Sequence, residues 1–220
     1  MEYCFVRNLI VLIYIFLCIG CASLNDHEKV SELVERGVMY ADNGQYELAI
    51  NEYDKALGMS PDDARAHNNK GNVYFIKGQY DIAIIEYKRA IYSNPEYAKA
   101  YNNLGYAHFQ KNDYEHALEE FSHAIARNPR YAKAYNNRGL AYFAIGEYER
   151  AILDYSTAIE IEPELAKPYD NRGFAYFMLD EFEKSCRDLA LACQLGECST
   201  YEMLLADGHC GDKLYALNSL

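Results

Sequence analysis

Proline recurs at a fixed interval along the chain, and this interval constrains the fold more than any other feature. Pro61, Pro95, Pro129 and Pro163 are separated from one another by 34 residues. A frame that starts at Val30 then divides the chain into five units, with the bounds 30–63, 64–97, 98–131, 132–165 and 166–199. Such a period is typical of an array in which each unit buries its apolar face only against its neighbours.

Small residues at fixed positions of the unit indicate two closely packed helices. Position 8 is always Gly and position 27 is always Ala, while position 20 is Ala in four units and Ser185 in the fifth. Position 17 is always aromatic: Tyr46, Tyr80, Tyr114, Tyr148 and Phe182. Proline at position 32 ends the second helix, because it cannot continue the backbone hydrogen bonding.

This pattern resembles the tetratricopeptide repeat (TPR) family over residues 30–199. The resemblance implies an all-α fold, a right-handed α-solenoid of five 34-residue helix–turn–helix repeats. Residues 200–220 follow as a C-terminal capping helix and tail, with an amphipathic helix over 200–207 whose Tyr201, Leu204 and Leu205 face inward. An array requires such a cap to cover its last apolar face.

The N-terminus is predicted to be an export signal. Residues 9–19 are an unbroken apolar run, which is well below the ~20 residues of a membrane-spanning helix. The stretch "LCIGCAS" resembles the bacterial lipobox, which implies a lipoprotein signal peptide over 1–20, lipidation (palmitate) of Cys21 and a polar tether over 21–29. Ala22 favours the outer membrane, facing the periplasm. A plain cleaved signal or a short anchor remains the alternative.

Four cysteines remain after residue 21, and export would allow them to form disulfides. Cys186 and Cys193 are seven residues apart, about 10 Å along one helix, whereas a disulfide requires Cα atoms within ~7 Å. If the terminal helix folds back antiparallel, the expected pairs are Cys186–Cys210 and Cys193–Cys198. The alternative is four reduced thiols in a packed cap.

The resemblance implies that the first helix of each unit (helix A) lines a concave groove. Its candidate peptide-binding residues occupy positions 2, 5, 6 and 12. Position 2 is basic (Arg65, Lys99, Lys133, Lys167), and position 5 is polar (Asn68, Asn102, Asn136, Asp170). Position 6 is Asn69, Asn103, Asn137 and Asn171, and position 12 is Phe75, Phe109, Phe143 and Phe177.

The paired asparagines raise a question, because Asn weakens a helix by several tenths of a kcal/mol relative to Ala. An amide can pair with both the N–H and the C=O of an extended peptide. We therefore expect the asparagines of positions 5 and 6 to bind a peptide backbone, and Asp170 is not included among the binding residues. The basic residues of position 2 and the phenylalanines of position 12 are expected to add contacts. The alternatives are a solvated polar face or a brace between neighbouring helices.

Charge and motifs exclude several functions. The net charge of −12 argues against binding nucleic acid, which requires clustered Lys and Arg. No catalytic or phosphate-binding motif is evident, so no enzyme activity, cofactor or small-molecule substrate is expected. His116 and His123 are interpreted as a solvated face and His108 as a packed core residue, so no metal site is predicted.

The sequence therefore predicts a membrane-anchored adaptor or scaffold of the bacterial cell envelope. Its partner would be a protein, bound through an extended peptide or an unfolded segment. The alternatives are a module that binds cell-wall (peptidoglycan) glycan or stem peptides, and a structural role in which arrays stack end to end.

Overall fold

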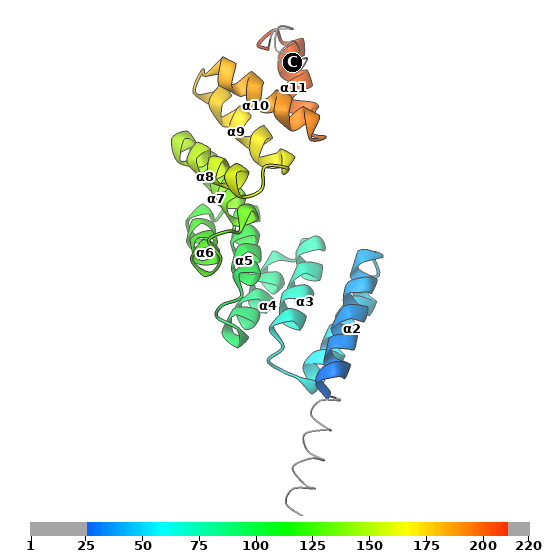
Figure 1. Cartoon of the computed structure of the whole chain (residues 1–220). Coiled ribbons are helices and arrows are strands. Elements are labelled where there is room, and N and C mark those ends of the chain that lie inside the picture. The colour runs from blue at the N-terminus through cyan, green and yellow to red at the C-terminus, as the bar shows by residue number, and fades with distance from the viewer. Residues whose placement is uncertain (1–25, 211–220) are drawn as a thin grey trace, which may run out of the picture. The chain divides into compact units, whose positions relative to one another are not determined.

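The structure is a computed structural model that describes residues 26–210 (Figure 1). These residues form two compact units, which divide between Pro95 and Glu96. The predicted signal peptide and Cys21, the predicted lipidation site, lie outside the described residues. None of the helices within 26–210 combines the length and the apolar character that a bilayer-spanning helix requires.

The N-terminal unit holds the first two repeats. Residues 26–42 are helical, and three further helices follow: α2 (Tyr46–Met59), α3 (Ala64–Ile76) and α4 (Tyr80–Ser93). Residues 26–29 of the predicted tether belong to the first helix. Their polar side chains are exposed, which is compatible with the first turn of a helix. The next turn is anchored in the core by Val30, Leu33 and Val34.

The C-terminal unit holds the other three repeats and the cap. Its helices pack consecutively on one another. They are α5 (Ala98–Gln110), α6 (Tyr114–Arg127), α7 (Ala132–Ala144), α8 (Tyr148–Ile161), α9 (Ala166–Met178), α10 (Phe182–Gln194) and α11 (Ser199–Ala206). The prediction of an all-α array of helix–turn–helix repeats with a terminal helix is confirmed. Within residues 26–210 no strand occurs.

The repeat frame and the helix bounds coincide. From the second repeat onward, helix A begins at position 1, and the second helix of every repeat (helix B) begins at the aromatic residue of position 17. The turn between the helices contains a residue with a left-handed backbone, for example Gly146 (φ 83°). The third repeat has Asn112 there (φ 60°), and Asn tolerates this conformation better than most residues with a side chain.

Glycine at position 8 is required by close packing within a repeat. A Cβ atom added to Gly139 would lie 2.6 Å from the Tyr155 ring, which is fully buried. The residue at position 24 therefore packs on the glycine of its own repeat.

Candidate peptide-binding face

The asparagines of helix A form a chain of hydrogen bonds in the C-terminal unit. Asn171 Nδ2 donates to Asn136 Oδ1, and Asn137 Nδ2 donates to Asn102 Oδ1, each over 2.9 Å. Within a repeat, Asn136 donates to Asn137 and Asn102 donates to Asn103, over the longer distances of 3.5 and 3.4 Å. Neighbouring A helices are thus braced by side-chain amides.

The position 5 asparagines are buried, which leaves them little surface for the peptide contact expected from the sequence. Asn68 is 0% exposed, and Asn102 and Asn136 are 6% and 9% exposed. A buried amide requires partners within the protein, because an unpaired one costs about 1–3 kcal/mol. The alternative expected from the sequence, a brace between neighbouring helices, therefore describes Asn102 and Asn136.

At position 6, Asn137 retains hydrogen-bonding capacity for a ligand. Asn137 is half-buried, donates one N–H to Asn102 and accepts one bond from Asn136. An amide offers two N–H groups and two lone pairs, so one of each is left on Asn137. The same side chain can therefore brace the array and meet a peptide backbone.

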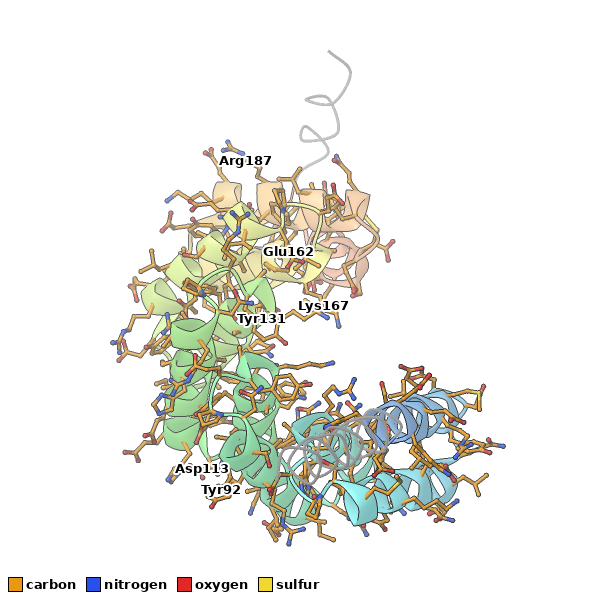
Figure 2. All side chains as sticks on the ribbon, turned by 60° about the horizontal axis from the view of Figure 1, so that its bottom comes forward. Tyr92, Asp113, Tyr131, Glu162, Lys167 and Arg187 are labelled. Atoms are coloured by element: carbon orange, nitrogen blue, oxygen red, sulfur yellow. A yellow bond between two sulfur atoms is a disulfide. The ribbon has the colours of Figure 1, made fainter. Side chains whose placement is uncertain are left out.

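A basic pocket lies between α7 and α9. Its volume is about 360 Å³, and it is lined by Lys133, Asn136, Asn137, Leu165, Ala166, Lys167, Pro168 and Glu197. Lys133 and Lys167 are exposed, and Lys167 points to a different side of this unit from Arg187 (Figure 2). Ala166 is the first residue of α9, and a helix N-terminus favours negative charge. The pocket therefore suits an anionic group.

The phenylalanines of position 12 are half-buried and do not form a separate stripe for a ligand. Each packs against the aromatic residue that begins helix B of its own repeat, with ring centroids 5.1–5.6 Å apart. The pairs are Phe75–Tyr80, Phe109–Tyr114, Phe143–Tyr148 and Phe177–Phe182. Their main contacts fix the turn, and only their exposed parts can reach a partner.

The remaining candidate peptide-binding residues lie on α5 and α3. Lys99 is exposed on α5, outside the pocket lining. On α3 of the N-terminal unit, Arg65 is exposed and its guanidinium lies 3.7 Å from the Asp63 carboxylate. Asn68 donates to Asn69 over 3.2 Å, which repeats the bond within a repeat seen in the other unit.

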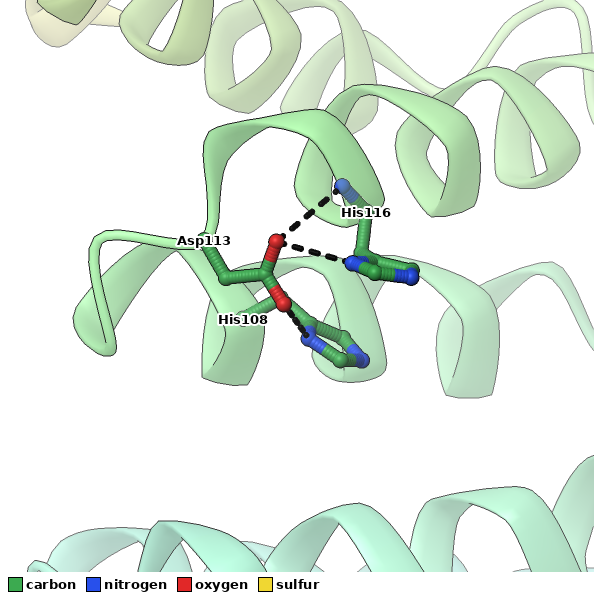
Figure 3. Close-up of side chains that lie close together, drawn as sticks. All are labelled: His108, Asp113 and His116. Atoms are coloured by element: carbon green, nitrogen blue, oxygen red, sulfur yellow. Dashed lines mark hydrogen bonds and ion pairs between the residues drawn. The ribbon is translucent and has the colours of Figure 1, made fainter.

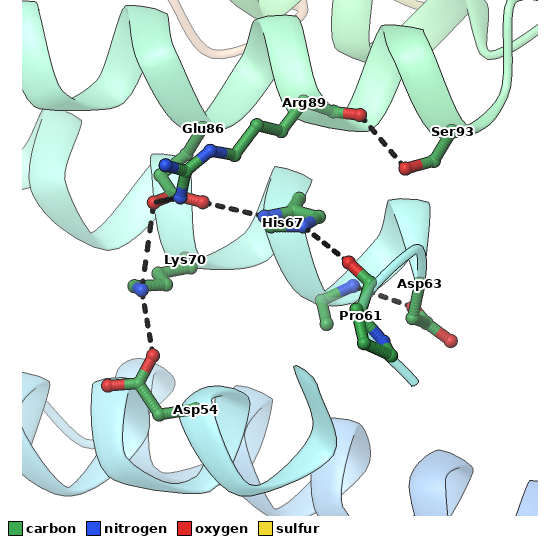
Figure 4. Close-up of polar contacts among 9 residues, drawn as sticks. Asp54, Pro61, Asp63, His67, Lys70, Glu86, Arg89 and Ser93 are labelled. Carbon is green, nitrogen blue, oxygen red and sulfur yellow. Dashed lines mark hydrogen bonds and ion pairs between the residues drawn. The ribbon is translucent and has the colours of Figure 1, made fainter. Parts of the chain in front are cut away.

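The N-terminal unit also holds a buried polar network that sequence reasoning missed (Figure 4). The Nδ1 and Nε2 atoms of His67 lie 2.7 Å from Glu86 Oε2 and 3.0 Å from the Pro61 carbonyl oxygen. Burial raises the pKa of Glu86, but the hydrogen bond from His67 and the charge of Lys70 hold it below its usual value.

Buried ion pairs add to the braces of the C-terminal unit. Arg138 binds both carboxylate oxygens of Asp154 over 2.8 Å and donates to Ser122 of the preceding repeat over 3.1 Å. Arg172 makes the same set of contacts one repeat later. A signal was available, because positions 7, 23 and 25 carry Arg, Asp and Ser in register.

The cap is joined to the last repeat by two disulfides. Cys186 is bonded to Cys210 and Cys193 to Cys198, with Cα atoms 5.5 and 4.0 Å apart. These are the two pairs that the sequence analysis expected. Tyr201 and Leu204 of α11 are buried against Cys186 and Leu189, and Leu205 packs at the edge of this cluster.

Comparisons with known proteins agree with this architecture. The family model described as "TPR repeat" matches residues 37–77, 71–111, 105–146 and 139–180. No curated protein sequence matches the chain.

Several solved structures share the fold. MamA is 27% identical, with a TM-score of 0.64 over 82% of this chain and 96% of the other. Pseudomonas aeruginosa PilF is 20% identical, with a TM-score of 0.79 over 87% and 86%.

YrrB, described as a TPR protein with an unusual peptide-binding site, is 21% identical, with a TM-score of 0.63 over 86% of this chain and 97% of the other. The fold, the repeat register and the family match agree, and the chain belongs to the TPR family.

Proposed function

We propose that this TPR protein is a lipid-anchored adaptor of the bacterial cell envelope that binds an extended, acidic peptide segment on the helix-A face of its C-terminal unit. The observation that carries the proposal is the pocket between α7 and α9, with Lys133 and Lys167 exposed beside Asn137. The chain carries a net charge of −12, and the two lysines supply local positive charge at this pocket.

The recognition follows from the two kinds of side chain. The lysines attract a carboxylate, from an acidic side chain or from a C-terminus, and Glu197 limits how much negative charge the pocket accepts. Asn137 offers one donor and one acceptor to the peptide backbone. Net hydrogen bonds contribute about 0.5–1.5 kcal/mol each, so a micromolar complex of about 8 kcal/mol requires contacts beyond this pocket. The exposed parts of the phenylalanine rings can supply some of them.

Two further features support the protein-binding class and the anchor. The helix–turn–helix array offers an extended surface of the kind that repeat proteins use for binding, and YrrB, which shares the fold, is described by its peptide-binding site. The lipobox-like stretch at Cys21 motivates the anchor at the outer membrane, facing the periplasm.

Photo-crosslinking in living cells tests the proposal. A photoreactive amino acid replaces Lys133, and in a matched strain it replaces Arg187, an exposed residue of α10. We expect a discrete adduct with a protein at position 133 and none at position 187. Lys167→Glu should weaken the adduct at 133 at least tenfold, because it reverses the charge of the pocket.

The outcomes separate the parts of the proposal. Adducts only with cell-wall material would replace peptide binding by the glycan or stem-peptide alternative, and equal adducts at both positions would argue against a defined site. Cys21→Ser tests the anchor independently, because it should abolish labelling by a fatty-acid analogue. Unchanged labelling in that variant would exclude the lipid anchor and leave peptide binding intact.

A further inference from the structure

The turn between helices A and B brings side chains of positions 11, 16 and 19 close to one another in the C-terminal unit. In the fourth repeat, the Arg150 guanidinium lies 4.7 Å from the centre of the Tyr142 ring. In the fifth, the Lys184 ammonium lies 5.2 Å from the Tyr176 ring and pairs with Glu181. Positions 11 and 19 are thus neighbours in both repeats, and position 16 joins them in the fifth.

The third repeat fills the same positions with His108, Asp113 and His116 (Figure 3). Asp113 Oδ2 lies 3.0 Å from His108 Nδ1, and Asp113 Oδ1 lies 2.8 Å from His116 Nδ1. The two imidazole rings stack, with centroids 5.2 Å apart. One potential ligand atom from each residue lies within 4.8 Å of the other two.

We propose that this His–Asp–His turn binds a divalent transition-metal ion, and that the physiological ion is Zn²⁺. Two imidazole nitrogens and one carboxylate oxygen are the donor set of open zinc sites, in which water or an external group takes the fourth position. In the sequence, His116 and His123 lie seven residues apart and were expected to share a solvated face. The structure instead brings His116 to His108, which lies on the preceding helix.

The surroundings favour a cation. Asp113 caps α6 by accepting a hydrogen bond from the backbone N–H of His116, and Tyr114 anchors the turn through Asn112. Glu115 and Glu119 add negative charge near His116. The His116 side chain is 58% exposed, which leaves a path for the ion, whereas that of His108 is 12% exposed.

Binding requires a small rearrangement at the turn. Zinc–nitrogen and zinc–oxygen bonds are about 2 Å long, so the three side chains must close around the ion. The hydrogen bonds between Asp113 and the two rings would be replaced by metal bonds. A neutral ring would then carry its proton on Nε2, while a ring that starts as imidazolium would release one proton to solvent.

Isothermal titration of Zn²⁺ into the untagged full chain, with the disulfides oxidised, tests the site. We expect one ion per chain and a rise in melting temperature on binding. His108→Tyr combined with His116→Lys recreates the residues of the fifth repeat at positions 11 and 19, so it should preserve the fold. It should weaken Zn²⁺ binding at least tenfold.

A matched variant locates the site. His123 lies on the same helix, where its Nε2 is 3.8 Å from Glu119, and it is not among the three clustered residues. His123→Lys should therefore leave Zn²⁺ affinity unchanged. Failure of the wild-type chain to bind Zn²⁺ with a Kd below about 1 mM would overturn the proposal. So would binding that survives the double variant, or binding that depends equally on His123.

Discussion

The interface between the fourth and fifth repeats and the interface between the fifth repeat and the cap are held together by different interactions. At the first, Asn171 donates to Asn136, and Arg172 reaches Ser156 of the preceding repeat. At the second, helix α11 replaces the next helix A. Leu205 occupies the position that Asn171 holds one repeat earlier, so the amide brace cannot continue.

The end interface shows what replaces the brace. Two disulfides and the buried Tyr201 and Leu204 hold the cap. At position 5 of the fifth repeat, Asp170 stands where earlier repeats have Asn, and it accepts a hydrogen bond from Thr200. Its buried Oδ1 atom has no hydrogen-bond partner among residues 26–210. Periodic polar braces therefore work only where a matching repeat follows, and a terminus requires apolar packing and covalent links.

The largest expected effect comes from cutting the covalent link of the cap. Cys186→Ser with Cys210→Ser opens a link between residues 24 positions apart and should reduce the free energy of unfolding by about 3 kcal/mol. The matched variant Cys193→Ser with Cys198→Ser removes the disulfide that closes a loop of only 5 positions, and it should reduce the free energy of unfolding by about 2 kcal/mol. Urea unfolding followed by circular dichroism measures both. A larger loss for the shorter loop would show that cap packing, rather than loop closure, sets the order.

The interior interface should respond to loss of its arginine. Arg172→Ala removes bonds of 2.6 and 2.9 Å to Asp188, whose side chain is 6% exposed. Removing one partner of a buried ion pair should reduce the free energy of unfolding by about 3 kcal/mol. This value is at the low end of the usual range because the Arg172 side chain is 19% exposed. The double variant with Asp188→Asn should recover part of this loss.

The exposed Arg187 on the next helix provides the control for this comparison. Arg187→Ala should change the free energy of unfolding by less than about 0.5 kcal/mol. Equal losses at positions 172 and 187, measured by the same urea unfolding, would show that the ion pair and its bond to Ser156 do not brace the interface.

The smallest effect concerns the carboxylate of Asp170. Burial raises its pKa above the usual 3.8, and the negative charge of Glu197 raises the pKa further. The hydrogen bond from Thr200 lowers the pKa but does not cancel the effect of burial. The folded state then holds the proton more tightly than the unfolded state, so this group lowers stability as pH rises above 3.8. Asp170→Asn should therefore stabilise the chain at pH 7 by about 1 kcal/mol or less.

The pH dependence is the measurement for Asp170. Thermal unfolding of the variant and the wild type should coincide near pH 3 and separate as the pH rises, with the variant more stable. A constant difference at every pH would mean that Asn restores an amide contact without any contribution from charge.

The sequence by itself determined the helices, their register and the identity of the small packing positions. Gly139 and Tyr155 belong to one 34-residue pattern, and a pattern repeated five times specifies local structure because every copy must satisfy the same packing. The two cysteine pairs were also within reach, since helix spacing excluded Cys186–Cys193.

Only the tertiary structure decided what the polar residues do. Asn102 and Asn136 look like ligand residues in the sequence, but the next repeat buries them and takes up their amides. His108 and His116 look unrelated, and the turn between two helices places them on one carboxylate. Periodicity specifies which face a residue occupies, whereas its partners depend on the distance and angle at which neighbouring helices pack.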